Sequence, residues 1–547
     1  MATKSILYYG DNLDVLRRHI QADSVDLVYL DPPFKSNQDY NILFKEKNGT
    51  RSQSQIKAFA DTWHWDEPAS RAYEEVVEKG GHVSLAMQAL RRYLGETDML
   101  AYLAMMAPRL VELKRVLKQT GSIFLHCDPS ASHYLKMLMD SVFGGEAFIN
   151  EIVWRRSHTR SSISRRFRRA HDVILFYAKA SGYKFNMPYR VLSKASKELY
   201  SHLDEHGAWQ SVPLLVSGRR KGKTGEPWHG IDPNLRGKNG MHWVTTPDKL
   251  DEYDRRGLII WPQKPGGTPR LKYYLDESPG VPTTDFWDDI PIIASSSSEA
   301  LGYPTQKPQA LLERIIQAGS DEGDVVLDPF CGCGTTVAAA QHLNRRWIGI
   351  DITHIAITLI RHRLHGTFGE KVIYEVLGEP VSLADAQALA RSDPYQFQWW
   401  ALGLVDARPA DPQRGADRGI DGRLFFHDEQ EGGKTKEIIL QVKAGHVTPA
   451  QVRDLRGVME REAAEIAVLI TMEEPSSAMQ VEAASAGFYK SPWGKKHPRL
   501  QILTIAELLA GKGIDLPPSR HVNVTFRKAP KLRSKGYDRC GRLFAEE

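Results

Sequence analysis

The chain has 547 residues, which is room for about three domains of ordinary size. Its 72 basic and 67 acidic residues leave a net charge of +5, and four cysteines are too few for a disulfide framework or a zinc cage. No apolar run approaches the roughly 18 residues of a membrane span, and the polar amino terminus does not resemble a signal peptide. These features predict a soluble intracellular protein with no membrane partner.

The first third of the chain alternates apolar runs of strand length with segments of helical periodicity. We expect strand, helix, strand, helix, strand and helix over residues 5–10, 13–20, 24–30, 99–117, 122–126 and 132–143. Residues 151–154 and 172–177 are typical of the two strands of a hairpin. Strands that alternate with helices predict a parallel α/β sheet, here with an antiparallel edge.

The connection of that hairpin is strongly basic. Between residues 155 and 169 it has seven arginines and no acid, interleaved with serines and Phe167. This pattern is typical of phosphate binding, although a solvated loop can have the same composition. The candidate nucleic-acid-binding residues are Arg155, Arg156, Arg160, Arg165, Arg166, Arg168 and Arg169.

Asp31, Pro32, Pro33 and Phe34 follow the second strand directly, where open α/β sheets place their ligands. The amino group of a nucleobase is a poor nucleophile because its lone pair is delocalised into the ring. The Asp31 carboxylate and the Pro32 carbonyl can both accept hydrogen bonds from such a group and direct its lone pair. Phe34 offers a ring on which a base outside the helix can stack. Alone, the tetrapeptide equally fits a strand that ends in a proline turn.

Periodicity fades over residues 185–298, which we interpret as an irregular inserted recognition region. Regular helix and strand patterns then return, in the order helix, strand, helix, strand, helix, over residues 308–318, 325–327, 335–343, 346–350 and 354–364.

A glycine-rich turn, Asp-Pro-Phe-Cys-Gly-Cys-Gly-Thr-Thr over residues 328–336, joins the first of these strands to a helix. Gly332 and Gly334 allow close approach of a ligand to the backbone. The turn lacks the spacing of a dinucleotide fingerprint and the lysine of a P-loop, so a cofactor with an amino-acid end suits it better than a phosphate. Asp351, after the next strand, can accept from both hydroxyls of a ribose. We expect the cysteines of the turn, Cys331 and Cys333, to pack as small residues.

Three motifs occur together in one order: residues 31–34, Tyr303-Pro-Thr-Gln-Lys-Pro308 and residues 328–336. Over about residues 5–364 the chain resembles the amino-methyltransferases of restriction-modification systems in their beta arrangement. The resemblance implies a Rossmann-like, circularly permuted α/β fold that uses S-adenosylmethionine, an inserted target-recognition region and double-stranded DNA as the substrate. It makes Asp31, Pro32, Pro33 and Phe34 the catalytic residues. It assigns cofactor binding to Asp11, Thr305, Lys307, Pro308, Asp328, Phe330, Gly332, Gly334, Thr335 and Asp351.

The resemblance also bears on the target base. An aspartate at position 31 favours adenine N6, whereas serine is usual for cytosine N4, which stays the alternative. Cytosine carbon-5 methylation needs a cysteine nucleophile, typically after proline, and the chain has no Pro-Cys pair. Methylation of protein glutamine usually goes with asparagine at this position. RNA stays open as a substrate because a flipped adenine looks alike in either polymer.

A third region begins near residue 373, with strands expected over residues 424–427, 437–442 and 466–471. Residues 395–509 resemble the Mrr-like branch of the PD-(D/E)xK nuclease fold, an α/β restriction-endonuclease-like domain, with residues 399–403 in its first helix. The resemblance gives Asp421 and Gln441 as candidate Mg²⁺ ligands and Lys443 as the residue that orients water. Gln396 and Gln398 stand where such folds often have a glutamate, so active DNA cleavage, which would make the protein a bifunctional restriction-modification enzyme, stays open.

We therefore expect a catalytic half, a recognition region, a cofactor-binding half, a nuclease-like domain and a basic tail, over residues 1–184, 185–300, 301–370, 371–516 and 517–547. The expected location is the cytoplasm of a prokaryote or a phage-infected cell, in association with the nucleoid. A homodimer or a companion restriction subunit is the expected assembly, and the recognition sequence cannot be read from these residues.

Overall fold

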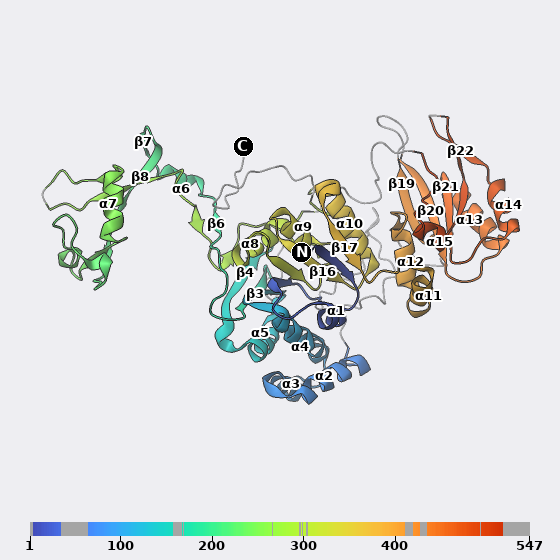
Figure 1. Ribbon diagram of the computed structural model, residues 1–547, viewed down its shortest axis with the longest axis horizontal. Helices are drawn as coiled ribbons and strands as arrows, with labels where there is room; N and C mark the ends of the chain where they lie inside the picture. Colours follow the sequence, from blue (N-terminus) through green and yellow to red (C-terminus); the bar gives the residue numbers. More distant parts are fainter. Residues whose placement is uncertain are drawn as a thin grey trace. The chain divides into compact units, whose positions relative to one another are not determined.

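The computed structural model describes residues 4–33, 64–156, 167, 169–264, 266–294, 297, 299–301, 303, 305–410, 419–426, 435–492 and 494–517. Two compact units are present, one drawn from Met1–Asn186 and Thr284–Arg533 and the other from Met187–Thr283 (Figure 1). Phe34, Arg160, Arg165, Arg166, Arg168 and all but the first residue of the predicted tail lie outside the described residues. Among the helices that are described, none is long and apolar enough to cross a membrane.

A nine-stranded sheet forms the centre of the first unit, in the order β14-β4-β5-β3-β2-β15-β16-β1-β17. The strands are β1 (Ser5–Tyr9), β2 (Val25–Leu30), β3 (Leu117–Cys127), β4 (Phe148–Arg155), β5 (His171–Ala178), β14 (Phe286–Trp287), β15 (Val325–Asp328), β16 (Arg346–Asp351) and β17 (Tyr374–Leu377). Only β5 runs antiparallel to its neighbours, β3 and β4. The predicted hairpin of β4 and β5 is confirmed, and it provides the antiparallel pairs near one edge of an otherwise parallel sheet. The sheet continues past β4, because the two-residue strand β14 adds to β4 in parallel.

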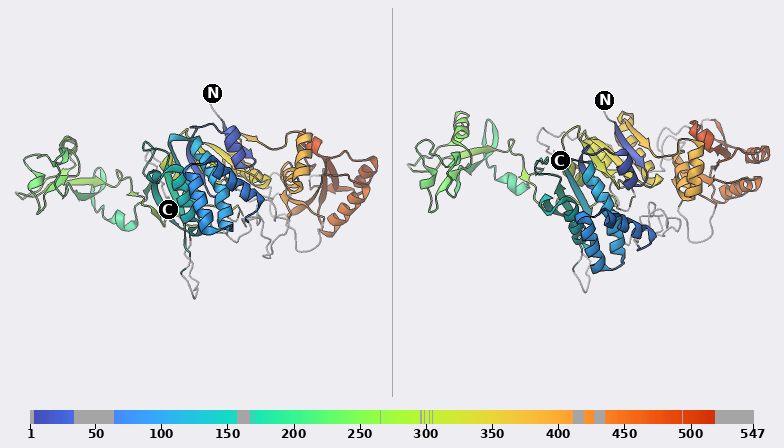
Figure 2. Two further views of the ribbon diagram at one scale, coloured as in Figure 1. Left: turned by 90° about the horizontal axis from the view of Figure 1, so that it is seen from below. Right: turned by 60° about the horizontal axis from the view of Figure 1, so that its bottom comes forward.

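Helices cover both faces of this sheet, and each face has its own apolar core (Figures 1 and 2). One face packs against α1 (Asn12–His19), α4 (Asp98–Val116) and α5 (Pro129–Phe143). The other packs against α8 (Gln309–Gly319), α9 (Thr335–His342) and α10 (His354–Phe368). All six helices were predicted from the sequence, although α4, α9 and α10 are buried over more than one side and do not present a single apolar stripe.

Two further helices, α2 (Glu67–Lys79) and α3 (Gly81–Leu94), pack on α4 and α5 and are absent from the sequence-based expectations. Their start has a readable signal. Asp66 accepts a hydrogen bond from the amide of Ala69 and proline occupies the first turn, which is the usual way for a helix to begin.

The second unit contains more regular structure than the expected irregular region. A four-stranded sheet has the order β11-β12-β8-β7, and a small core surrounds the buried Trp228 and Trp243. The elements are β6 (Tyr189–Arg190), α6 (Lys194–Glu198), β7 (His202–Asp204), β8 (Gly207–Pro213), β9 (Leu215–Ser217), β10 (Met241–Trp243), α7 (Pro247–Arg255), β11 (Ile259–Ile260), β12 (Arg270–Tyr274) and β13 (Val281–Pro282). Six of these eight strands have only two or three residues, which is too few for a pattern of alternation to be recognised, and the longer β8 and β12 were not predicted either.

The carboxy-terminal part of the first unit is an α/β domain around a sheet of order β18-β19-β20-β21-β24. The strands are β18 (Arg408–Pro409), β19 (Gly422–Phe426), β20 (Lys436–Lys443), β21 (Ile466–Thr471) and β24 (Leu500–Thr504), with a separate hairpin of β22 (Phe488–Lys490) and β23 (Lys496–Pro498). One face carries α11 (Leu383–Ser392), α12 (Pro394–Gly403) and α15 (Ile505–Leu509), and the other α13 (Pro449–Arg461) and α14 (Ser477–Ser485) (Figure 1). The three predicted strands and the placement of residues 399–403 in a helix are confirmed.

The parallel pair of β2 and β15 joins segments that are far apart in the chain, with Leu27 opposite Val326 and Val28 opposite Leu327. We call this strand pair the β2–β15 seam. Asp26, which is 2% exposed, lies at its start. Its Oδ2 accepts from the amide of Val325 at 3.0 Å and from Lys118 Nζ at 2.8 Å. The seam thus combines strand pairing with a buried charge-assisted hydrogen bond.

We expect Asp26→Ala to lower the free energy of unfolding by about 2–3 kcal/mol, because the Val325 amide and the Lys118 ammonium both lose their buried acceptor. Urea unfolding of the full chain measures this. Asp321→Ala is the matched control, since Asp321 also faces a lysine, Lys184, but its side chain is 59% exposed. Equal effects of the two substitutions would contradict the role of Asp26 at the seam.

Candidate active site

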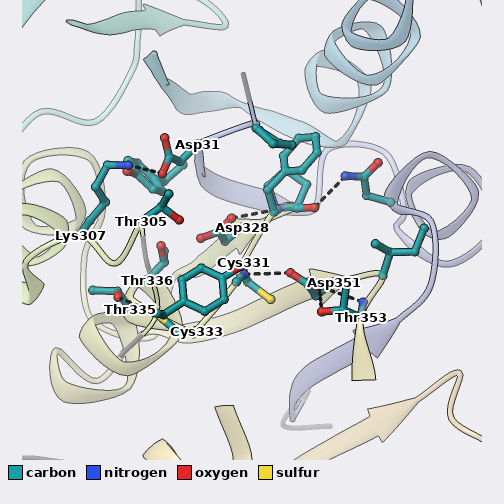
Figure 3. Close-up of a pocket in the computed structure, with 18 of the residues that line it drawn as sticks. Asp31, Thr305, Lys307, Asp328, Cys331, Cys333, Thr335, Thr336, Asp351 and Thr353 are labelled. Atoms are coloured by element: carbon teal, nitrogen blue, oxygen red, sulfur yellow. Dashed lines mark hydrogen bonds and ion pairs between the residues drawn. The ribbon is translucent and has the colours of Figure 1, made fainter. Parts of the chain in front are cut away.

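Four neighbouring strands, in the order β2-β15-β16-β1, end at the same edge of the sheet. Because they are parallel, their carboxyl ends bring together Asp31, Asp328, Asp351 and Asp11. These four acids line a single cavity of about 310 Å³. Figure 3 shows Asp31 at one end of the pocket, Asp351 at the other and Asp328 between them.

Lys307 approaches Asp31 directly. Its Nζ forms an ion pair with Asp31 Oδ2, and both side chains are mostly buried (Figure 3). Lys307 was predicted to bind the cofactor, but the structure places its ammonium at the Asp31 end of the pocket. Pro33 also lines the cavity and Pro32 is buried beside it, whereas Phe34 lies outside the described residues.

The glycine-rich turn can hold only glycine at two positions. Gly334 caps α9 in the left-handed conformation, with φ +72°, and a Cβ there would lie 2.7 Å from Ile360 Cγ1. Gly332 has φ +48°, and a Cβ would lie 3.2 Å from Tyr303 Oη. The bare backbone therefore forms one wall of the cavity, as expected for a turn that approaches a ligand closely.

Asp351 and Asp328 are held by hydrogen bonds without an ion pair among the described residues. Asp351 accepts from the amide of Gly332 and from both the amide and the hydroxyl of Thr353, each at 2.9 Å. Burial raises the pKa of Asp351 to about 6 and that of Asp328 to about 7, although hydrogen bonds to each carboxylate act in the opposite direction. A cavity lined by two such acids favours a ligand that brings positive charge.

Asp11 has a different environment. Its side chain caps α1 by accepting from the amide of Leu13 at 2.8 Å, and its Oδ2 pairs with Arg109 Nη2 at 2.7 Å. Arg109 Nε also donates to Asn12 Oδ1, while Asn12 Nδ2 donates to the carbonyl of Pro329 at 2.8 Å. This chain of contacts ties the end of β1 to the glycine-rich turn.

Arg109 and Asn12 were not singled out from the sequence. One signal could have identified Arg109, because it is the only charged residue between Asp98 and Glu112 in an otherwise apolar helix. Of the ten predicted cofactor residues, eight line the cavity, namely Asp11, Thr305, Lys307, Asp328, Phe330, Gly332, Thr335 and Asp351. Pro308 and Gly334 lie in the same segments without lining it.

Cys331 and Cys333 are buried free thiols in the turn, and burial raises the pKa of both. A neutral, buried thiol packs like a small apolar residue, so the prediction made for these cysteines is confirmed.

The described arginines of the basic connection all lie near acids. Arg156 Nε is 3.2 Å from Asp172 Oδ1, Arg169 Nη1 is 3.4 Å from Asp128 Oδ1, and Arg155 Nη2 is 3.9 Å from Asp288 Oδ2. Phosphate binding by this cluster stays a prediction.

In the carboxy-terminal domain, Asp421, Gln441 and Lys443 come together around β20. Asp421 Oδ2 accepts from the amide of Val442 at 2.7 Å, and Gln441 Oε1 is buried without a hydrogen-bond partner among the described residues. Gln398 Nε2 reaches the carbonyl of Asp421 at 3.5 Å, but Gln396 points to α10 instead. Within the described ranges no group of three or more His, Cys, Asp or Glu side chains could hold a metal ion.

Comparison with known families gives two matches. The model of a DNA methylase family that acts on N6 and N4 positions matches residues 25–361. The model described as NACHT-associated inactive restriction endonuclease 1 matches residues 396–510.

Among individual proteins, the chain is 31% identical over 363 residues to the type II methyltransferase M.EcaI of Enterobacter cloacae, covering 66% of this chain and 69% of that protein. It is also 31% identical over 386 residues to the Mod subunit of the type III restriction-modification enzyme StyLTI of Salmonella typhimurium, covering 68% of this chain and 54% of the subunit. A solved Thermus thermophilus protein, a candidate DNA modification methylase in complex with S-adenosyl-L-methionine, matches with a TM-score of 0.33 at 17% identity, over 69% of this chain and 99% of that one.

We expect the affinity for S-adenosylmethionine, which carries a sulfonium and an ammonium, to rise between pH about 5 and about 7.5, because Asp328 and Asp351 lose their protons in this interval. Raised pKa values also mean that the cofactor-free protein loses stability as the pH rises through them. Isothermal calorimetry at stepped pH measures the first effect. Asp351→Asn should flatten the profile, and a pH-independent dissociation constant in the parental protein would contradict the electrostatic argument.

Proposed function

The chain belongs to the DNA methylase family of N6 and N4 methyltransferases, and on this premise we propose that it transfers a methyl group from S-adenosylmethionine to adenine N6 at specific sites in double-stranded DNA. The family match makes the protein a DNA methyltransferase of the N6 or N4 type with a carboxy-terminal restriction-endonuclease-like domain. The base, the cofactor and the roles of individual residues are our proposals.

One observation carries the proposal: the Asp31 carboxylate sits at the end of β2 in the same cavity as the glycine-rich turn. Any group that reacts next to Asp31 is therefore next to a cofactor held by that turn. The residues fit S-adenosylmethionine because the bare backbone at Gly332 leaves room for a ligand and the buried acids suit a cation.

When bound, S-adenosylmethionine supplies an electrophilic methyl group on a positively charged sulfur. Asp351 would accept hydrogen bonds from the ribose, and the Asp31 carboxylate and the Pro32 carbonyl would each accept a hydrogen bond from one N–H of the target amino group. This holds the lone pair toward the methyl group and stabilises positive charge that develops on the nitrogen. Lys307 keeps the Asp31 carboxylate in place through its contact with Oδ2. The nitrogen would take the methyl group as the bond from that group to sulfur breaks and leaves a neutral thioether, and the nitrogen would lose one proton, for which Asp31 is the adjacent acceptor.

Adenine N6 is our choice over cytosine N4 because an aspartate opens the catalytic tetrapeptide. The second unit is proposed to read the DNA sequence, and its exposed aromatic rings include Trp261, which stacks on the buried Trp228. The seven arginines of residues 155–169, in and beside the β4–β5 connection, are proposed to bind phosphates. A companion restriction subunit is a further proposal, in line with the relative that is itself a Mod subunit.

We expect Asp31→Ala to lower the rate of methyl transfer at least about 100-fold, because the target amine loses an acceptor that acts in the transition state. Binding of S-adenosylmethionine should persist, since Asp31 lies at the opposite end of the cavity from Asp351. The assay is mass spectrometry of nucleosides from unmethylated genomic DNA incubated with the protein and cofactor.

Asp31→Asn is the matched variant, because it keeps an acceptor oxygen but loses the charge, and it should retain intermediate activity. Methylation by Asp31→Ala at the parental rate would overturn the catalytic assignment. Formation of N4-methylcytosine by the parental chain would overturn the choice of adenine while leaving the methyltransferase itself intact.

We propose that the nuclease-like domain does not cleave DNA. In its described part Asp421 is the one predicted acid, its Oδ2 is bound to the Val442 amide, and the matching family is described as inactive. A neutral glutamine at position 441 in place of a second carboxylate weakens the attraction for Mg²⁺.

Unmethylated DNA incubated with Mg²⁺ and the full chain should therefore stay intact by gel electrophoresis, both with the parental protein and with Lys443→Ala. Fragments that appear with the parental protein and disappear with Lys443→Ala would instead establish the bifunctional enzyme.

A further inference from the structure

One side chain of the restriction-endonuclease-like domain reaches the cavity of the methyltransferase. Trp399, on α12, is 8% exposed and lines the cavity together with Asp351 and Ile355. It packs against Ile355 and Leu359 of α10, and Tyr303 contacts the same cluster. No predicted cofactor motif includes this residue, because it lies in the part of the chain assigned to another domain.

Polar contacts fix α12 against the start of α10. Gln396 Oε1 accepts a hydrogen bond from the amide of His354 at 3.2 Å. His354 is the first residue of α10, and amides in that position have no partner within their own helix. Its ring stacks on Tyr9 with centroids 3.7 Å apart, and its Nδ1 lies 3.3 Å from Glu379 Oε1. The start of α10, which follows Asp351, thus receives a hydrogen-bond acceptor from Gln396 of the carboxy-terminal domain.

The contact continues to the other end of α12. A Cβ at Gly403 would lie 2.8 Å from Thr358 Oγ1, so a larger residue there requires the Thr358 side chain or α12 to shift. Beyond it, His362 Nε2 lies 3.2 Å from Asp406 Oδ1. The position of Trp399 is therefore set along the whole length of α12.

We propose that Trp399 forms part of the wall that binds the adenosine end of S-adenosylmethionine, so that cofactor binding and the docking of α12 on α10 stabilise each other. The inference rests on the proposed function, because it takes Asp351 to hold the ribose. An indole ring offers a large, rigid apolar surface beside that carboxylate. Coupling of this kind is reciprocal. If a partner that pulls α12 away from α10 lowers the affinity for the cofactor by some factor, the bound cofactor lowers the affinity for that partner by the same factor.

Substitutions in the full chain test whether Trp399 contributes to cofactor binding. Trp399→Ala should raise the dissociation constant for S-adenosylmethionine at least about fivefold, as expected for the loss of an aromatic contact with a base. Gly403→Ala should raise it as well, by displacing α12 without removing the ring. Tyr395→Ala is the control, since Tyr395 lies on the same helix, is 47% exposed and does not line the cavity. Parental affinity in folded Trp399→Ala and Gly403→Ala would overturn the proposal.

Hydrogen exchange in the unmodified chain tests the coupling without any variant. Saturating S-adenosylmethionine should slow exchange of the amides of α12, while those of α13 and α14, on the far face of the domain sheet, should be unaffected. Protection confined to residues that precede α11 would overturn the coupling. A parental chain that binds no S-adenosylmethionine at all is a different result: it would overturn the proposed function and the coupling with it.

Discussion

The parallel pairing of β2 with β15 is the constraint on which the site depends. The two strands come from opposite sides of the inserted unit, yet their carboxyl ends lie next to each other and deliver Asp31 and Asp328 to one cavity. Asp26 secures the other end of the pair through the Val325 amide. Neither half of the chain could build the cavity alone, because one contributes the tetrapeptide and the other the glycine-rich turn.

The four acids of the cavity fall into two electrostatic classes. Asp31 and Asp11 each pair with a cation, Lys307 and Arg109, so their charges are balanced by the protein. Asp328 and Asp351 have only hydrogen-bond donors around them in the described structure, and burial brings their pKa values close to neutrality. The protein thus leaves uncompensated negative charge in the cavity that is proposed to hold a cationic cofactor, and it balances the charge of the carboxylates whose geometry must stay fixed.

Sequence patterns were sufficient to predict the alternating strands and helices of the methyltransferase part. Six helices of the methyltransferase part, the buried strands between them and the motif around Asp31 were predictable because each has a local signal, although α2 and α3, with 13 and 14 residues, were missed. The second unit, with its core of tryptophans, was not predicted as regular structure, since most of its strands are short; β11, for example, has two residues.

Arg109 and Trp399 were missed for another reason. Both reach the cavity from helices distant in the chain. Arg109 has a local signal in its isolated charge, but nothing local marks Trp399 as lining a site that is built elsewhere. Gln396 stands where such folds often have a glutamate, and the sequence suggested that this change weakens a metal site. In the structure the Gln396 side chain instead makes a hydrogen bond to the start of α10.

The seam between β2 and β15 also constrains how the chain is made. While the protein is being synthesised, β2 has β3 on one side but must wait for its other neighbour until about 300 more residues have emerged, which at 5–20 residues per second takes roughly 15–60 s. During that time an apolar strand edge stays open, and such edges pair readily with other chains. β1 waits still longer, because both of its partners, β16 and β17, follow β15. A fold with this order therefore has an unpaired apolar strand edge on the ribosome, well before the last domain is complete.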